Sequence, residues 1–141
     1  MVLLAFVITL MAAGTTLAAE EVREIQDNSF LIEEAYNQED GVIQHIQAFQ
    51  YFKGDNWQYT FTQEWPVPGQ THQLSYTIPA ERIKVDGQDD AGIGDVALNY
   101  RYQAVLKDGI AFAPRLSLIL PTGDRKKGLG TGTVGYQVNL P

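Results

Sequence analysis

The sequence contains no cysteine and little positive charge, and both absences narrow the range of functions. Without cysteine, neither a disulfide framework nor a thiolate metal site can form. The chain carries 10 Lys and Arg against 17 Asp and Glu, a net charge of −7, so it lacks the basic surface that nucleic-acid binding requires. Hydrophobic residues make up 45% and charged residues only 19%, a composition that argues against disorder.

Long apolar runs are also scarce. The one strongly apolar stretch, residues 2–13, is short for a membrane-spanning helix, which takes about 20 residues. Small residues follow it as far as Ala19, and two glutamates come next. This pattern predicts a secretory signal peptide over residues 1–18, with cleavage after Ala18 favoured over cleavage after Ala19. The usual basic start is missing, since Arg23 is the first positive charge, and an uncleaved membrane anchor is the alternative.

Residues 19–41 are polar and acidic, and we expect them to form a periplasmic segment that precedes the folded region. Within this segment, residues 30–36 predict a short helical turn capped by Asn28 or Ser29.

From residue 42 onward the hydrophobic period changes to two, which is typical of strands. The pattern predicts about six strands, near residues 42–52, 57–65, 73–78, 95–103, 112–120 and 133–140. Several approach the 9–11 residues that a tilted membrane strand needs, whereas strands of soluble proteins average about 5–6. We therefore predict an all-β fold over residues 42–141, an antiparallel transmembrane β-barrel. Because single-chain barrels have at least about eight strands, the chain is expected to be an incomplete N-terminal portion of a larger barrel. A barrel assembled from several chains is the alternative.

The predicted connections divide into two groups. Residues 53–56, 81–92 and 121–132 would lie at one end of the barrel and include both long loops. Residues 66–71 and 106–109 would form short turns at the other end. Outer-membrane barrels keep short turns in the periplasm and long loops outside, so this division supports a membrane barrel.

Polar and aromatic side chains fall on opposite faces of the predicted strands. Polar groups are expected to face a wet lumen, where charges are tolerated, and the candidates are Glu64, Asp95, Asn99, Arg101 and Arg115. The aromatic residues are expected to form girdles at the membrane interfaces: Trp57, Tyr59, Trp65, Tyr76, Tyr100, Tyr102 and Tyr136. Trp57 and Trp65 would be about 20 Å apart in height, roughly the spacing of two girdles. Two core tryptophans of a soluble sandwich are the alternative.

No catalytic or metal site is predicted. The glycine-rich run 128–133 lacks the following helix that a phosphate site needs, and the aspartates at 86, 89, 90 and 95 do not have the spacing of a calcium loop. His72, Ser75 and Asn99 could suggest a hydrolase, but the odd spacing puts His72 and Ser75 on opposite faces of a strand. The basic run 125–127 is expected to be a solvated loop, with lipid headgroup contact as the alternative. We predict a protein that is not an enzyme and has no cofactor.

Five segments carry a resemblance to a known family: NSFLIEEAYNQE at 28–39, YTFTQEWPVP at 59–68, GIGD at 92–95, NYRY at 99–102 and LPTGD at 120–124. Together they resemble bacterial outer-membrane β-barrel transporters related to the meta-pathway phenol-degradation group. The resemblance implies a longer barrel in a Gram-negative outer membrane. It brings no catalytic residues and names no solute.

Three functions follow from these predictions. The favoured one is an outer-membrane pore or transporter for small solutes, including hydrophobic or aromatic ones, with membrane lipid as its partner. The second is a structural or adhesive barrel without transport. The third is a soluble secreted barrel that binds a hydrophobic ligand with its aromatic face turned inward. The sequence predicts neither the solute nor the oligomeric state.

Overall fold

A computed structural model of the chain describes residues 5–9 and 35–141. Almost all of its regular structure is β. The strands are β1 (Ala5–Thr9), β2 (Gln44–Phe52), β3 (Asn56–Pro66), β4 (His72–Val85), β5 (Gln88–Ile93), β6 (Val96–Tyr102), β7 (Val105–Lys107), β8 (Ile110–Phe112), β9 (Arg115–Leu120) and β10 (Gly135–Asn139). A single 3-10 turn, η1 (Arg125–Lys127), interrupts the loop between β9 and β10. Among the described residues, no helix is long and apolar enough to cross a membrane.

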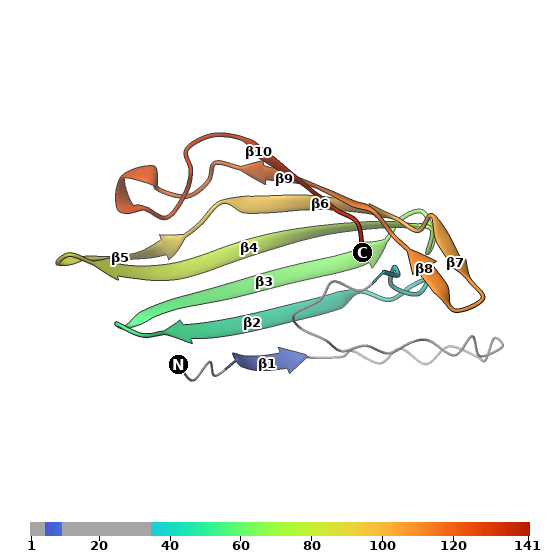
Figure 1. The fold of residues 1–141 in the computed structure, drawn as a ribbon, viewed down its shortest axis with the longest axis horizontal. Helices are drawn as coiled ribbons and strands as arrows, with labels where there is room; N and C mark the ends of the chain where they lie inside the picture. Colours follow the sequence, from blue (N-terminus) through green and yellow to red (C-terminus); the bar gives the residue numbers. More distant parts are fainter. Residues whose placement is uncertain (1–4, 10–34) are drawn as a thin grey trace.

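One antiparallel sheet of eight strands dominates the structure (Figure 1). Seven of them lie in the order β1-β2-β3-β4-β6-β9-β10, and β5 pairs with β4 beside this path. The long strand β4 pairs with β6 through His72–Thr77 and with β5 through Ala80–Val85. The strands β5 and β6 therefore act as one strand that is broken at Gly94 and Asp95. A separate hairpin of β7 and β8 continues beyond β6 and β9.

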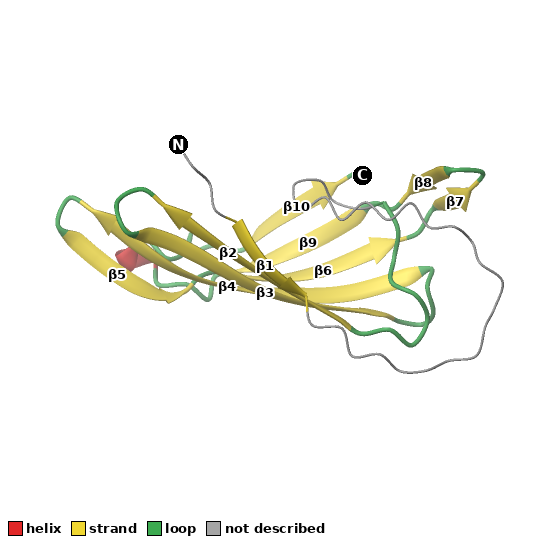
Figure 2. Ribbon diagram, turned by 90° about the horizontal axis from the view of Figure 1, so that it is seen from below, coloured by secondary structure: helices red, strands yellow, loops and turns green. Residues whose placement is uncertain are grey.

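The sheet is curved but open. Figure 2 shows it bending along its width, with β2 and β10 rising on either side. In the described part of the chain, β1 pairs only with β2, and β10 pairs only with β9. The prediction of an all-β antiparallel fold is confirmed, while barrel closure stays a prediction.

The predicted strand count was too low. The six predicted strands correspond to β2, β3, β4, β6, β9 and β10, and the structure adds β1, β5, β7 and β8. The predicted long loop at 81–92 is also wrong, because most of it is the β4–β5 hairpin. Asp86 and Gly87 both have positive φ, 52° and 84°, as a two-residue type I′ turn requires. Asp108 and Gly109 repeat the arrangement between β7 and β8, with φ of 54° and 78°.

The connections nevertheless divide between the two ends as expected. The β2–β3 turn, the β4–β5 hairpin and the long loop after β9 lie together at one end of the sheet (Figure 1). The β3–β4 turn and the β7–β8 hairpin lie at the other end, which we call the short-turn end.

The N-terminal predictions meet the structure only in part. Ala5–Thr9, inside the predicted signal peptide, pairs with β2 from Ala5 opposite Gln50 to Thr9 opposite Ile46. Cleavage of this segment stays a prediction. Most of the helical turn predicted at 30–36 lies outside the described residues, and its last two residues, Ala35 and Tyr36, form a bend.

The sheet has almost no apolar core. Among the described residues only two hydrophobic side chains are buried, Ala113 and Leu129. Seven polar or charged side chains are buried instead: Asn37, Glu64, Gln73, Ser75, Asn99, Arg101 and Ser117. This is the reverse of the usual distribution in a water-soluble protein.

Candidate lumen face

A continuous row of polar side chains crosses the sheet. The strand register places one polar residue from each of six strands side by side: Gln44, Glu64, Ser75, Asn99, Ser117 and Gln137. The four in the middle of the row are nearly inaccessible, with relative exposures between 2% for Ser117 and 7% for Asn99. We call the face that carries this row the polar face.

The neighbouring row, one residue along, points to the opposite side because side chains alternate along a strand. It consists of Trp65, Leu74, Tyr100, Leu116 and Val138. These side chains are apolar or aromatic, and four of them are exposed, from 37% for Leu74 to 63% for Val138. We call this side the apolar face.

Side-chain hydrogen bonds link the strands across the polar face. The Asn99 Nδ2 donates to Ser75 Oγ at 3.1 Å, and the Gln73 Nε2 donates to Glu64 Oε2 at 3.0 Å. The hydroxyls of Thr62 and Thr77 are 2.8 Å apart. The polar groups thus find many of their hydrogen-bond partners within the sheet, which lowers the cost of burying them.

Four of the five predicted lumen residues belong to this polar face. Glu64, Asn99 and Arg101 are buried on it, and Arg115 is half-buried and directly opposite Arg101 in the register. Asp95 has a different role, because it lies in the break between β5 and β6 and binds the long loop. It accepts hydrogen bonds from Gly123 N at 3.0 Å and from Thr131 N and Oγ1, both at 2.8 Å.

The long loop packs back onto the polar face at its own end of the sheet. Leu129 is only 3% exposed, and its side chain lies against Gly92. Gly123 and Leu129 approach each other so closely that an added Cβ on Gly123 would overlap the Leu129 carbonyl. The glycines of this loop therefore permit its compact fold.

The aromatic candidates form two clusters rather than one continuous band. Towards the short-turn end, the rings of Trp65 and Tyr76 are 6.0 Å apart, and His72 lies 5.9 Å from Tyr100 and 5.4 Å from Tyr102. The second cluster lies nearer the opposite end of β2 and β3, where Trp57 stacks on Phe49 at 6.1 Å. Tyr59 lies between the two, and its hydroxyl donates to Gln47. Tyr136 is separate from both and 79% exposed.

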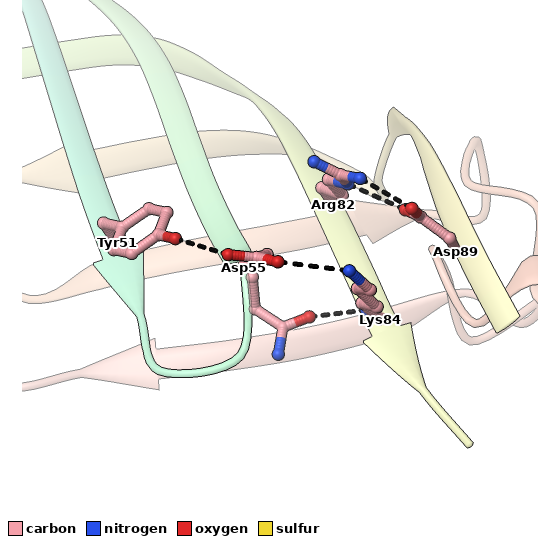
Figure 3. A network of polar contacts seen from close by, with 6 residues as sticks. Tyr51, Asp55, Arg82, Lys84 and Asp89 are labelled. Atoms are coloured by element: carbon pink, nitrogen blue, oxygen red, sulfur yellow. Dashed lines mark hydrogen bonds and ion pairs between the residues drawn. The ribbon is translucent and has the colours of Figure 1, made fainter. Parts of the chain in front are cut away.

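A charged network stabilises the hairpins at the long-loop end (Figure 3). The Tyr51 hydroxyl donates to Asp55 at 2.9 Å, and the Lys84 ammonium contacts the other Asp55 oxygen at 3.1 Å. Arg82 binds Asp89 through two hydrogen bonds of 2.7 and 2.6 Å. These donors hold the pKa of the Asp55 carboxyl below its ordinary value, the Tyr51 hydroxyl foremost and then Lys84.

The three residues considered for hydrolysis do not form one site, because His72 lies apart from the other two. Ser75 is bonded to Asn99 on the polar face, whereas the His72 Nδ1 lies 2.6 Å from the hydroxyl of Tyr100 on the apolar face. Within residues 35–141, no three Asp, Glu or His side chains form a group that could hold a metal ion.

Three buried or bridging residues of this region carry no distinguishing signal in the sequence: Gln73, Gln103 and Asn37. Gln73 and Asn37 are the largest fully buried side chains of the described chain. Gln73 appeared only as one alternating polar residue, and Asn37 lies in a segment without strand periodicity. Only the contacts made across the fold distinguish them.

Comparison with known proteins adds no assignment. No family model, no curated protein and no solved structure matches this chain, so the resemblance to outer-membrane transporters stays a prediction.

Proposed function

We propose that the chain forms part of the wall of an outer-membrane β-barrel that carries small solutes across the membrane. One observation supports this most strongly: adjacent rows of the same sheet alternate between buried polar and exposed apolar side chains. In water this arrangement is unfavourable, because it leaves apolar surface wet and places polar groups where apolar ones would be more stable.

A bilayer reverses that balance. Acyl chains favour the exposed leucine, valine and aromatic side chains, while a lumen accommodates Glu64, Asn99 and Arg101. The soluble alternative needs the aromatic face turned inward. The segments that fold back on the sheet, which contribute Asn37 and Leu129, cover the polar face instead. This contact favours the membrane proposal.

A matched pair of arginine substitutions tests the proposal in the full-length protein. Leu118 on β9 and Gln137 on β10 lie on opposite faces, and both are exposed. Leu118→Arg should destabilise the folded protein by about 2–4 kcal/mol if the residue meets lipid near the bilayer centre. Gln137→Arg should be tolerated, because it faces the lumen.

The measurement is urea unfolding in lipid vesicles, monitored by the heat-dependent shift in gel mobility. Conductance across a planar bilayer then separates a pore from a structural barrel. Equal tolerance of both variants, with a monomer that stays soluble without detergent, would show that the sheet is not a membrane wall.

A further inference from the structure

A short segment at the start of the second described range, residues 35–141, lies across the polar face near the short-turn end. It comprises residues 35–38, which we call the strap. The strap belongs to no strand. Its backbone is instead bound by side chains that project from the sheet, and Asn37 is only 1% exposed.

Gln103, just beyond β6, binds the strap at two points. Its Nε2 donates to the carbonyl of Ala35 at 2.9 Å, and its Oε1 accepts from the backbone N–H of Asn37 at 2.8 Å. The neighbouring Arg101 donates from Nη1 to the carbonyl of Tyr36 at 3.0 Å. Three successive strap residues are thus bound by two side chains at one end of the polar face.

Gln73 on β4 binds the next strap residue. Its Oε1 accepts from the backbone N–H of Gln38 at 2.7 Å, while its Nε2 donates to Glu64 on β3. The Asn37 side chain completes the attachment by donating to the carbonyl of Gln70 in the β3–β4 turn at 2.8 Å. Gln73 therefore uses both ends of its amide to join the strap to the polar row.

We propose that the strap is a fixed constriction that sets the upper size of the solutes the pore admits. This inference rests on the proposed function. A chain segment held against the lumen wall reduces the open cross-section at that level. Because side chains from β4 and from the end of β6 hold it, the restriction lasts as long as those hydrogen bonds do. The pore would then admit small molecules and exclude larger hydrophilic ones.

Removing the two glutamines tests the constriction. In the Gln73→Leu/Gln103→Leu variant the amides are lost while side-chain size is roughly kept. Conductance should rise, and larger polyethylene glycols should enter the pore, as measured by polymer exclusion in planar bilayers. Gln58→Leu is the control, because Gln58 shares the face of the polar row but lies near the other end of β3.

A second readout follows the strap itself. The chain contains no cysteine, so Asn37→Cys introduces a unique thiol at a buried position. A water-soluble maleimide should modify it slowly in the otherwise unchanged protein. Labelling should be about tenfold faster or more when Gln73 and Gln103 are replaced, because each lost hydrogen bond favours local opening. Asp108→Cys, at an exposed hairpin tip, should label rapidly in both backgrounds.

The outcomes separate the two proposals. A wild-type pore whose conductance and polymer cut-off do not change in the glutamine variant would overturn the constriction and leave the pore standing. Unchanged labelling of the thiol at position 37 would overturn the binding role of the glutamines. A protein that never conducts in a bilayer would overturn the proposed pore, and the constriction with it.

Discussion

The two ends of the sheet both carry a chain segment folded over the polar face, but different chemistry holds each one. At the short-turn end, the strap is bound mainly by the neutral amides of Gln73 and Gln103. At the long-loop end, the carboxylate of Asp95 accepts hydrogen bonds from three donors in the loop after β9. Hydrogen bonds to a charged acceptor are roughly twice as strong as neutral ones, so the loop should resist opening more than the strap does.

The loop also depends on close backbone packing around its glycines. The largest effect is therefore expected from Gly123→Ala, because the new Cβ would overlap the carbonyl of Leu129. Overpacking of this kind typically costs about 1–3 kcal/mol. Arg125, Lys126 and Lys127 are exposed already, but cleavage there requires local unfolding of the loop, so trypsin should cut the variant faster, and the cleavage rate measures this.

Gly135→Ala provides the matched control for that substitution. The nearest atom to its added Cβ is 3.6 Å away, at ordinary contact distance. Equal trypsin rates in the two alanine variants would show that the loop is not held by close packing.

An intermediate effect is expected from Asp95→Asn. The amide keeps one acceptor oxygen but loses the charge and the second acceptor, so the three hydrogen bonds to Gly123 and Thr131 cannot all persist. The loop should lose about 1–2 kcal/mol of stability. Faster exchange of the Gly123 and Thr131 amide hydrogens would report the change, with the strap amides unaffected.

Asp86→Asn removes the same charge from the nearby hairpin turn, where asparagine tolerates the left-handed backbone. In the Asp86→Asn variant, the amide hydrogens of Gly123 and Thr131 in the long loop should exchange as in the wild type. If the loop amides exchanged equally faster in Asp95→Asn and Asp86→Asn, net charge, and not the Asp95 hydrogen bonds, would govern the loop.

The smallest effect concerns pH at the exposed tip of the β2–β3 turn. Because the pKa of Asp55 is depressed in the folded protein, its contribution to stability is present above its ordinary pKa, about 3.9. The contribution is lost as the pH falls through the depressed folded value. Tyr51→Phe removes the leading donor, so the pKa should rise towards the ordinary value, as carboxyl NMR titration can measure. A titration curve that does not move would exclude the Tyr51 hydroxyl as the cause.

Much of the sheet could be predicted from the sequence, because alternation is local information. Trp57, Tyr59 and Phe61 identify the apolar face of β3 without knowledge of its neighbours. The β4–β5 hairpin was missed although its signal, Asp86-Gly87, is also local. Residues 81–92 lack a clear hydrophobic alternation, which favours a loop, whereas the Asp-Gly pair favours the left-handed two-residue turn of a hairpin.

The bound segments could not be predicted in this way. The strap contacts join residues separated by 33 to 68 positions. Gln73 and Gln103 do not differ in sequence pattern from other polar residues of the wall. Their role depends on register and curvature, which place them beside a segment that has no periodicity of its own. Asp95 illustrates the same limit, since its charge suggested the lumen while its partners are loop amides.

The pairing of β1 with β2 has a consequence for the edge of the sheet. If a peptidase removes residues 1–18, the edge of β2 from Ile46 to Gln50 loses the strand that pairs with it on that side within residues 5–9 and 35–141. A bare strand edge is a template that recruits whatever extended chain is nearby. In that case Ala5–Thr9 would be a temporary partner of β2, and the time of its removal would decide which strand pairs with β2 next.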